Sequence, residues 1–367
     1  MFRDAYTQKS VLVTGHTGFK GSWLCEWLIL IGARVTGLSL PPPSSPALFD
    51  LLDLRHRLDH IEGDVRDPDL LGRIVAGEKP DFIFHLAAQP LVRRSYREPA
   101  ETFEINVQGT VNLLDAVRRS AHRCNVVVIT SDKCYENRET DCSYRETDPL
   151  GGYDPYSASK AAAELVVGAY RRSFFGPDSL VRLASARAGN VIGGGDWAED
   201  RFVPDCIRAL SAGRPIPVRN PRSTRPWQHV LEPLAGYLWL GACLDDPARA
   251  DSGKASFAEA FNFGPGLSAN KSVSELLTEV LKHWPGQWVD AGERQAFHEA
   301  VLLNLAIDKA WHQLRWRPLW SFETCVRNTV TWYRQVNDSP DLAQSSCREQ
   351  LQSYLNDARA AGLAWSL

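Results

Sequence analysis

The sequence lacks any closely spaced pair of cysteines. Its 8 cysteines are scattered over 367 residues, none forms a CxxC pair, and several lie in apolar runs where a thiol behaves as a small hydrophobic group. Structural zinc sites and disulfide frameworks usually show paired, regularly spaced cysteines. The distribution therefore argues against a metal site or a disulfide framework and is typical of a reducing compartment.

Long apolar runs and basic runs are also missing. No stretch approaches the ~18 apolar residues that cross a bilayer, and the first ten residues lack the apolar core of a secretion signal. Lys and Arg total 41 against 44 Asp and Glu, a net charge of −3, and no basic stripe suggests a nucleic-acid-binding surface. We therefore expect a cytoplasmic protein that binds neither membranes nor nucleic acid.

Short apolar, β-branched runs alternate with helix-forming segments through the first half of the chain. The predicted strands are 10–15, 33–40, 60–67, 81–89, 125–130 and 180–187, and predicted helices include 22–31, 48–58 and 101–118. This alternation predicts an α/β fold, a Rossmann-type doubly wound parallel sheet. Because 367 residues exceed one typical domain, we expect a second, smaller lobe.

A glycine-rich turn follows the first predicted strand and precedes a helix, with glycines at 15, 18 and 21. Glycine permits the tight turn and lets backbone N–H groups approach a pyrophosphate at the helix N-terminus. In this strand–turn–helix context the pattern predicts a dinucleotide site.

The rest of the dinucleotide fingerprint is incomplete. The strand at 33–40 ends without the acidic residue that binds the ribose of NAD, and no arginine sits there to favour NADP, so this position leaves the choice open. Asp64 is a candidate for the adenine amino group or a simple turn residue. Ala87 and Ala88 are small enough to let a cofactor cross.

Tyr156 and Lys160 are four residues apart. If Asp154 caps a helix that starts at Pro155, both side chains leave the same face about one turn apart. A tyrosine titrates near ~10, and lowering its pKa by about three units requires roughly 4 kcal/mol, which a nearby ammonium can supply. We therefore expect Lys160 to lower the pKa of Tyr156.

Three polar residues, Ser131, Asp132 and Lys133, follow the buried strand predicted at 125–130. Open α/β sheets bind ligands at the carboxyl ends of their strands. The stretch from residue 130 to 160 is therefore the predicted centre of the chemistry.

Two further stretches are candidates for ligand contacts. The glycine-rich loop at 188–196 is too flexible to be there for stability and is expected to shape itself around a ligand. Arg219, Arg222 and Arg225 cluster, which is usual for a solvated face, but a diphosphate also needs cations. We single out Arg225 for that role.

Five motifs carry a family resemblance: GHTGFKGSW at 15–23, TSDKCYEN at 130–137, YDPYSASK at 153–160, RAGNVIGGGDWAEDRFVPD at 187–205 and RPWQHVLEPL at 225–234. Together they resemble the extended short-chain dehydrogenase/reductase family, and within it the nucleotide-sugar 4,6-dehydratases. The similarity runs from about residue 8 to 336. Relatives that act on dTDP-glucose or GDP-mannose carry a glutamate where this chain has Lys133. The tripeptide Ser131-Asp132-Lys133 therefore resembles that of the relatives that act on CDP-sugars.

The resemblance implies bound NAD, CDP-glucose as substrate, and a 4-keto-6-deoxy sugar product for deoxysugar biosynthesis. The implied cofactor-binding residues are Gly15, Thr17, Gly18, Phe19, Lys20, Gly21, Asp64, Val65, Leu86, Ala87, Ala88, Asn106, Tyr156 and Lys160. The implied substrate-binding residues are Gln89, Asn190, Arg219, Arg225, Asn262 and His298. Relatives often have arginine where this chain has His298. A homodimer or homotetramer is expected.

The resemblance also divides the chain. An NAD-binding Rossmann domain is expected at 1–186, with 227–260 returning to it. The substrate-binding lobe is expected at 187–226 and 261–336, and 337–367 forms a helical tail.

The implied catalytic residues are Ser131, Asp132, Lys133, Tyr156 and Lys160. Tyr156 takes the C4 hydroxyl proton while NAD accepts the C4 hydride, Ser131 binds that hydroxyl, and a protonated Asp132 assists loss of the C6 hydroxyl. Two routes remain open for removal of the C5 proton. Neutral Lys133 removes it, or charged Lys133 stabilises the enolate while Tyr156 or water is the base.

Two other functions fit parts of this pattern. A nucleotide-sugar 4-epimerase, or another nucleotide-sugar 4,6-dehydratase, uses the same fold, but an epimerase has no task for Asp132 and Lys133. A dinucleotide-sensing regulator without turnover has no need of a tyrosine with a lowered pKa.

Overall fold

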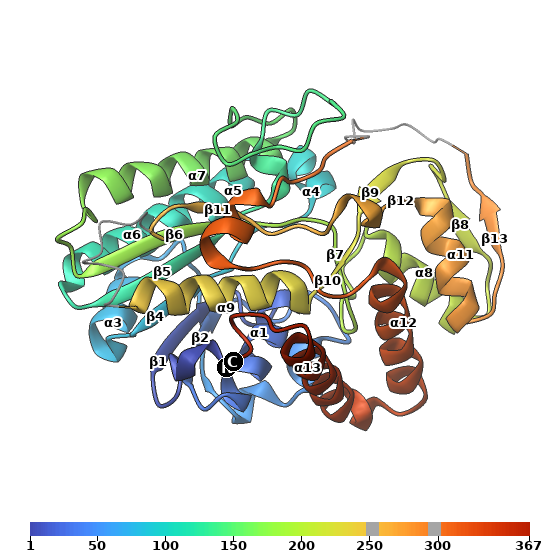
Figure 1. Ribbon diagram of the computed structural model, residues 1–367, viewed down its shortest axis with the longest axis horizontal. Helices are drawn as coiled ribbons and strands as arrows, with labels where there is room; N and C mark the ends of the chain where they lie inside the picture. Colours follow the sequence, from blue (N-terminus) through green and yellow to red (C-terminus); the bar gives the residue numbers. More distant parts are fainter. Residues whose placement is uncertain (247–256, 293–301) are drawn as a thin grey trace.

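A computed structural model describes residues 1–246, 257–292 and 302–367. Within these residues a seven-stranded parallel sheet has the order β11-β6-β5-β4-β1-β2-β3 (Figure 1). Its strands are β1 (Ser10–Thr14), β2 (Arg34–Ser39), β3 (Asp59–Glu62), β4 (Phe82–His85), β5 (Cys124–Ile129), β6 (Val181–Arg187) and β11 (Ala260–Asn262). The doubly wound sheet predicted from the sequence is confirmed, and its strand order reverses between β1 and β4, where such folds bind ligands.

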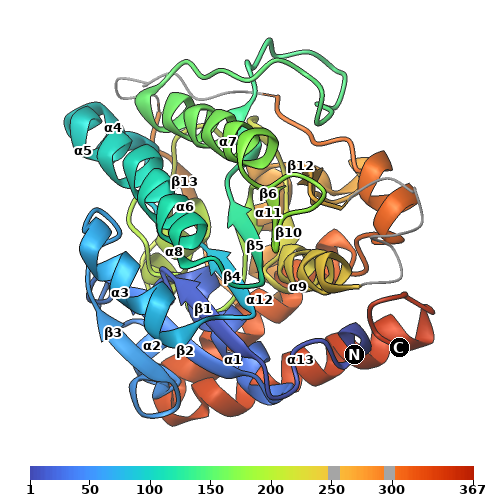
Figure 2. The same cartoon turned by 90° about the vertical axis from the view of Figure 1, so that its left-hand side faces the viewer.

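Helices cover both faces of the sheet (Figure 2). On one face lie α3 (Pro68–Glu78), α6 (Gly109–Ser120) and α7 (Pro155–Ser173), and on the other lie α1 (Phe19–Leu30) and α9 (Leu231–Asp245). Both faces are therefore buried, which explains why the strands are continuous apolar runs.

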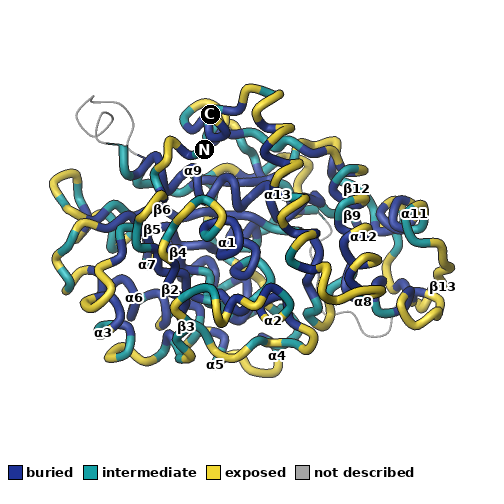
Figure 3. Tube along the Cα trace, turned by 90° about the horizontal axis from the view of Figure 1, so that it is seen from below, coloured by how far each residue is buried: buried dark blue, intermediate teal, exposed yellow. Residues whose placement is uncertain are grey.

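Each face has its own hydrophobic core, and β1 shows how a single strand serves both. Val11 and Val13 pack with α1 and α9, whereas Leu12 packs with the side of α3, α6 and α7. All three are fully buried, and Figure 3 shows this buried centre beneath more exposed outer helices. The alternation follows from the two-residue period of a strand.

Helix α9 is apolar on every side apart from Glu232 in its first turn, and every residue from Leu231 to Leu244 is buried. One side contacts β5 and β6. On another side, Glu232 accepts hydrogen bonds from the Trp320 backbone at 2.7 Å and from the Tyr354 hydroxyl at 2.8 Å. An all-apolar helix requires cover of this kind on every side.

The C-terminal tail supplies part of that cover. Its main element is α13 (Ala343–Ala360), and the preceding helix α12 (Phe322–Asp338) ends one residue beyond the expected start of the tail at 337. Arg348 of α13 and Arg57 both bind the buried carboxylate of Glu26 on α1, at 2.8 and 2.6 Å. The two termini lie side by side (Figure 1). The Phe2 amide donates a hydrogen bond to the Trp365 carbonyl at 2.7 Å.

A smaller set of elements gathers at one end of the molecule, on the right of Figure 1. They are β7 (Val191–Ile192), α8 (Phe202–Ser211), β8 (Ile216–Val218), β9 (Thr224–Pro226), β10 (Gln228–His229), β12 (Asn270–Ser272), α11 (Val273–His283) and β13 (Trp288–Asp290). The expected lobe boundary at 261 falls inside β11, which belongs to the large sheet. The domain limits therefore stay a prediction.

Two predicted helices are interrupted. The segment 48–58 forms only α2 (Leu48–Leu51) and a 3₁₀ turn at Leu54–His56, because Asp53 between them has φ +49°. The segment 101–118 begins earlier, after α4 (Val92–Arg97), as α5 (Pro99–Phe103). A π-helical turn at Glu104–Gln108 then joins it to α6.

A buried ion pair ties α7 to the sheet. Glu164 and Arg187 lie 2.8 Å apart, and their side chains are 2% and 4% exposed. The Glu164 carboxylate also accepts hydrogen bonds from the hydroxyls of Thr130 at 2.5 Å and Ser185 at 2.8 Å. Burial raises the pKa of Glu164, but the charge and hydrogen bond of Arg187 and the two hydroxyls outweigh it and lower the pKa overall.

We predict that Arg187→Met lowers the free energy of unfolding by about 3–5 kcal/mol, because it leaves the Glu164 carboxylate buried without a cation. The double variant with Glu164→Gln should be more stable than Arg187→Met alone, since the uncompensated charge is gone. Urea unfolding followed by tryptophan fluorescence measures both. Arg118→Met, which breaks a pair on the surface of α6, is the matched control and should cost under about 1 kcal/mol; an equal loss in both arginine variants would contradict the account.

Candidate active site

The glycine-rich turn lies directly against the end of β4. Gly15 has φ +76°, and a Cβ there would lie 2.7 Å from the Ala87 amide nitrogen. A Cβ at Gly21 would lie 2.2 Å from the Gly15 carbonyl oxygen. Glycine is required at both positions by the fold itself. At Gly18 the nearest atom is 3.4 Å away, so any requirement there comes from a ligand.

The N-terminus of α1 offers amide groups to an anion. The first amide with a helical acceptor is that of Ser22, which donates to the Gly18 carbonyl at 2.8 Å. The amides of Phe19, Lys20 and Gly21 precede this bond, and such N-terminal donors of a long helix suit a pyrophosphate. The residues present therefore fit the diphosphate of a dinucleotide.

The end of β2 carries hydroxyl groups in place of an acid. The Thr17 hydroxyl lies 2.8 Å from the Ser39 hydroxyl and donates to the Leu40 carbonyl at 3.0 Å. Thr17 is 3% exposed, so this side chain fastens the turn to β2. Its implied contact with a cofactor stays a prediction.

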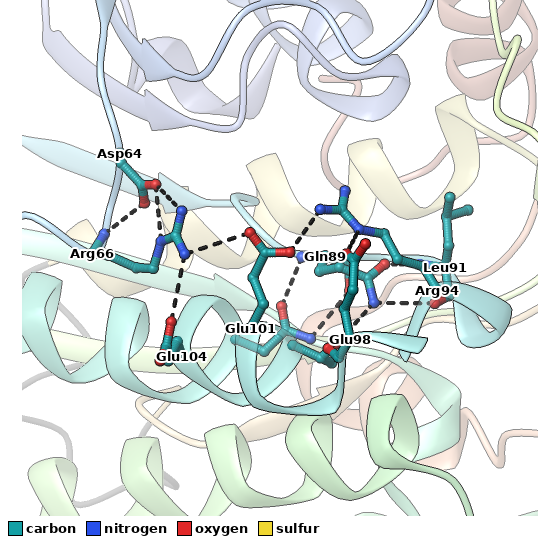
Figure 4. A network of polar contacts seen from close by, with 10 residues as sticks. Asp64, Arg66, Gln89, Leu91, Arg94, Glu98, Glu101 and Glu104 are labelled. Carbon is teal, nitrogen blue, oxygen red and sulfur yellow. Dashed lines mark hydrogen bonds and ion pairs between the residues drawn. The ribbon is translucent and has the colours of Figure 1, made fainter. Parts of the chain in front are cut away.

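Asp64 follows β3 and is paired with Arg66 (Figure 4). Its carboxylate accepts from the Arg66 amide at 2.8 Å and from the guanidinium at 2.9 and 2.6 Å. Burial works to raise its pKa, but these bonds lower it overall. Arg66 also reaches Glu101 and Glu104, each at 3.5 Å. An adenine amino group at Asp64 would have to share carboxylate oxygens that already accept hydrogen bonds from Arg66. The neighbouring residue Val65 is buried.

Two of the implied substrate residues are already hydrogen-bonded within the protein. Gln89 is 2% exposed, and its amide bonds Leu91 and Thr102 (Figure 4). Asn262 is fully buried, and its amide bonds the Tyr135 hydroxyl at 2.7 Å and two backbone carbonyls. Both amides therefore hold parts of the chain together, and their implied contacts with substrate stay a prediction.

Asn106 has a positioning role. It lies in the π-helical turn, and its amide exchanges hydrogen bonds with the Gln89 backbone at 2.8 and 3.1 Å. The same amide donates to the Ser159 hydroxyl of α7 at 2.8 Å. It therefore connects the segment after β4, which includes Leu86, Ala87 and Ala88, with the helix that carries Tyr156.

Helix α7 begins as predicted. Asp154 accepts from the Ser157 amide at 2.9 Å, and Pro155 is the first helical residue. Tyr156 and Lys160 are 8% and 5% exposed and lie one turn apart. Among the described residues, no ion pair to the Lys160 ammonium is formed. An unpaired buried ammonium of this kind fits the hydroxyl groups of a ribose.

The predicted lowering of the Tyr156 pKa is wrong for this structure. Burial raises the pKa of Tyr156 to about 12, and the hydrogen bond with Ser131 and the charge of Arg201 lower it only in part. Burial also lowers the pKa of Lys160 to about 8, against the effect of Glu164. Desolvation therefore outweighs the attraction that the sequence argument relied on.

The Asp132 side chain lies between the two loops that follow β5 and β6. Its carboxylate accepts from the Ser131 hydroxyl and from the Asn190 amide, both at 3.0 Å. A Cβ at Gly189 would lie 2.0 Å from it. The loop at 188–196, which was predicted to surround a ligand, therefore also packs around the Asp132 carboxylate.

The remaining predicted residues lie at different places. Lys133 is half-buried in the 3₁₀ turn after Ser131. Arg219 is exposed after β8, and Arg225 is half-buried in β9, where it donates to the Thr224 carbonyl at 2.8 Å. His298 lies outside the described residues.

Two residues beside Tyr156 were missed in the sequence. Arg201 precedes α8 and pairs with Asp196 at 2.9 Å, and Tyr237 on α9 accepts a hydrogen bond from the Lys20 ammonium at 2.8 Å. Arg201 stands in the 187–205 motif, which was the available signal, whereas Tyr237 is hidden in an apolar run. We define the Tyr156 cluster as Lys20, Ser131, Asp132, Tyr156, Lys160, Asn190, Arg201 and Tyr237.

Comparisons with known proteins agree with this geometry. The profile of the NAD dependent epimerase/dehydratase family matches residues 11–251, and the chain belongs to that family. CDP-glucose 4,6-dehydratase of Salmonella typhimurium is 46% identical over 360 residues, which cover 96% of this chain and 98% of the relative. The family resemblance predicted from the motifs is confirmed.

More distant relatives are similar over nearly the same span. dTDP-glucose 4,6-dehydratase of Neisseria gonorrhoeae is 30% identical over 359 residues, covering 89% of this chain and 96% of the relative. The crystal structure of the dTDP-glucose 4,6-dehydratase DesIV from Streptomyces venezuelae, with NAD bound, has a TM-score of 0.73 and 28% identity, over 89% of this chain and 97% of that one. In the part of this chain that the structure describes, no helix is long and apolar enough to span a membrane, and no three His, Cys, Asp or Glu side chains gather as metal ligands.

Two glycine variants separate the fold requirement from the ligand requirement. Gly15→Ala should lower the melting temperature and weaken NAD binding, because its Cβ meets the backbone of β4 and its φ is positive. Gly18→Ala should leave the melting temperature within a few degrees of the wild-type value but weaken NAD binding about tenfold or more, because a methyl group blocks close approach of the pyrophosphate. Calorimetry and cofactor titration measure the two effects. Unchanged binding in Gly18→Ala would place the diphosphate elsewhere.

Proposed function

We propose that this protein catalyses the NAD-dependent dehydration of CDP-glucose to CDP-4-keto-6-deoxyglucose. The observation that carries the proposal is the meeting of Ser131 and Asp132 with Tyr156 at the carboxyl end of β5. The identity of 46% to a CDP-glucose 4,6-dehydratase over nearly the full length supports the choice of substrate.

The first half of the reaction is assigned to Tyr156, Ser131 and Lys160. NAD, held by the glycine-rich turn and Lys160, would supply reversible hydride transfer, from C4 of the sugar and back to C6. Tyr156 takes the proton of the C4 hydroxyl, and Ser131, which acts to lower the pKa of the phenol, binds the same hydroxyl. Lys160 holds the ribose and supplies positive charge near the phenol. A positioned base of this kind contributes about 10²–10⁴-fold.

The second half is assigned to Asp132 and Lys133. Oxidation at C4 makes the C5 hydrogen acidic, because the resulting carbanion is an enolate. Lys133 is assigned the removal of that proton, and Asp132, which accepts hydrogen bonds from Ser131 and Asn190, is assigned the transfer of a proton to the departing C6 hydroxyl. Hydride return to C6 then leaves the cofactor unchanged overall.

Incubation of the purified protein with NAD and CDP-glucose tests the proposal. We expect the alkali-labile chromophore of a 4-keto sugar to form, and to form at least about tenfold more slowly from dTDP-, GDP- or UDP-glucose. Faster turnover of another sugar nucleotide would overturn the assignment of the base. A product that keeps its C6 hydroxyl would identify a 4-epimerase, the function named for the Thermotoga maritima UDP-glucose 4-epimerase of similar fold.

Substitution of Lys133 separates a base from a bound cation. Lys133→Met should allow C4 oxidation but lower formation of the 6-deoxy product about 10²–10⁴-fold. Lys133→Arg keeps the positive charge, but arginine cannot give up its proton near neutral pH, so it should fail equally. Single-turnover absorbance of the reduced cofactor together with product analysis reports both steps. An active Lys133→Arg variant would instead assign Lys133 to enolate stabilisation.

We also propose a homodimer or homotetramer in the cytoplasm. The nucleotide-sugar relatives support a biosynthetic role, and sedimentation of the purified protein measures the assembly.

A further inference from the structure

A buried histidine at the end of β4 has no task in the proposed reaction. His85 is the last residue of β4 and is 2% exposed. Its Nδ1 lies 2.7 Å from the hydroxyl oxygen of Thr14, the last residue of β1, and its Nε2 lies 3.3 Å from the hydroxyl oxygen of Thr110 on α6. The ring therefore joins the two strands between which the strand order reverses, and it links them to a helix on one face of the sheet.

The neighbouring hydrogen bonds fix where the proton of this ring lies. The Thr110 hydroxyl donates to the Asn106 carbonyl at 2.8 Å, so it accepts from His85, and Nε2 carries the proton. Burial lowers the pKa of His85 to about 3, so the ring is neutral and Nδ1 is an acceptor. Thr14 therefore donates to Nδ1, while its oxygen accepts from the Ala87 amide at 3.2 Å.

These bonds form one chain with a single direction, which passes from Ala87 through Thr14, His85 and Thr110 to Asn106. The side chains of the last four residues are buried. Hydrogen bonds in a chain of this kind polarise and strengthen one another where water is excluded. Loss of the Nε2–H donor therefore weakens the hold on Asn106 as well as the bond to Thr110.

The far end of the chain holds an irregular turn. Asn106 lies in the π-helical turn Glu104–Gln108, and such turns are frequent at functional sites. Its side-chain amide donates to the Ser159 hydroxyl at 2.8 Å, and that hydroxyl donates to the Tyr156 carbonyl at 2.7 Å. A displacement of the turn is therefore transmitted to the start of α7, which carries Tyr156.

We propose that His85 is a positioning residue whose Nε2–H hydrogen bond to Thr110 sets where Tyr156 lies beside the crevice between β1 and β4. The bond acts through the π-helical turn, Asn106 and Ser159. In this role His85 transfers no proton and binds no reacting atom. The inference rests on the proposed NAD-dependent function.

Two substitutions of His85 separate its ring nitrogens. His85→Asn places an amide near the position of Nδ1 and loses the bond to Thr110, whereas His85→Gln places an N–H group near the position of Nε2 and keeps that bond. His85→Asn should slow C4 oxidation of CDP-glucose about 10–10²-fold in single-turnover absorbance of the reduced cofactor, because a shift of about 1 Å at the reacting groups has an effect of that size. Kd for NAD should stay within about threefold, since the glycine-rich turn is unchanged. His85→Gln should keep the oxidation rate within about threefold of the wild-type rate.

Thr110→Val removes the same bond from the other side and keeps the shape of the side chain. We expect the same slowing of C4 oxidation, and no further loss when it is combined with His85→Asn. Thr329→Val is the matched control. The Thr329 hydroxyl, 1% exposed, donates to the Cys325 carbonyl one turn earlier in α12 at 2.8 Å, as Thr110 does in α6. This control should lower the melting temperature by a similar amount and leave the oxidation rate unchanged.

Hydrogen exchange tests the hold on the turn in the protein without cofactor or sugar nucleotide. The backbone amides of 104–110 should exchange at least about tenfold faster in His85→Asn and in Thr110→Val than in the wild-type protein. His85→Gln and Thr329→Val should exchange there at the wild-type rate. ¹⁵N NMR of the histidine rings should show the proton of His85 on Nε2.

Three results would overturn the inference. Equal slowing in His85→Asn and His85→Gln would show that the Nε2–H group positions nothing. Slowing in Thr329→Val as large as that in Thr110→Val would assign the effect to lost stability, and this comparison decides alone if neither His85 variant folds. Unchanged exchange at 104–110 would show that the bond does not hold the turn. Failure of the wild-type protein to reduce NAD with CDP-glucose would instead end the proposed function, while hydrogen exchange would still report whether His85 holds the turn.

Discussion

The reacting groups depend on one buried carboxylate. Glu164 lies one turn beyond Lys160 on α7 and receives hydrogen bonds from β6 and from the residue after β5. These bonds prevent the helix from rolling on the sheet, and they thereby set where Tyr156 and Lys160 point. Arg187 extends the network through the Tyr135 hydroxyl, at 2.7 Å, to β11. A buried network of this kind rigidifies the site, although the Nε of Arg187 has no hydrogen-bond partner among the described residues.

The Tyr156 cluster combines three cations, of which Arg201 is paired with Asp196 at 2.9 Å. Lys20, Lys160 and Arg201 share the site with Asp132, and burial makes every one of these charges costly. The raised pKa of Tyr156 means that the phenol needs more positive charge before it can act as a base at neutral pH. The oxidised ring of a bound cofactor supplies such a charge. Cofactor binding and base strength are therefore coupled in this account.

Much of the fold was predictable, because a sheet buried on both faces leaves continuous apolar strands in the sequence, and because Asp154 and Pro155 mark the start of α7. The π-helical turn in 101–118 was not, since its residues favour an ordinary helix. Among the site residues, the sequence could not tell that the amides of Gln89 and Asn262 close internal loops, because an amide at a strand end serves either purpose. Tyr237 was hidden because tertiary packing alone brings α9 to the cluster. The sign of the Tyr156 pKa shift depended on the extent of burial, which sequence spacing does not report.

The central claim is that one set of side chains holds the sugar while hydride leaves C4 and returns to C6 of the same molecule. CDP-glucose carrying deuterium at C4, mixed with an equal amount of ¹³C-labelled CDP-glucose, tests this claim by mass spectrometry of the product. The account predicts that the deuterium is retained at C6 and stays on molecules without ¹³C. Deuterium lost to water, or found on ¹³C-labelled product, would contradict it.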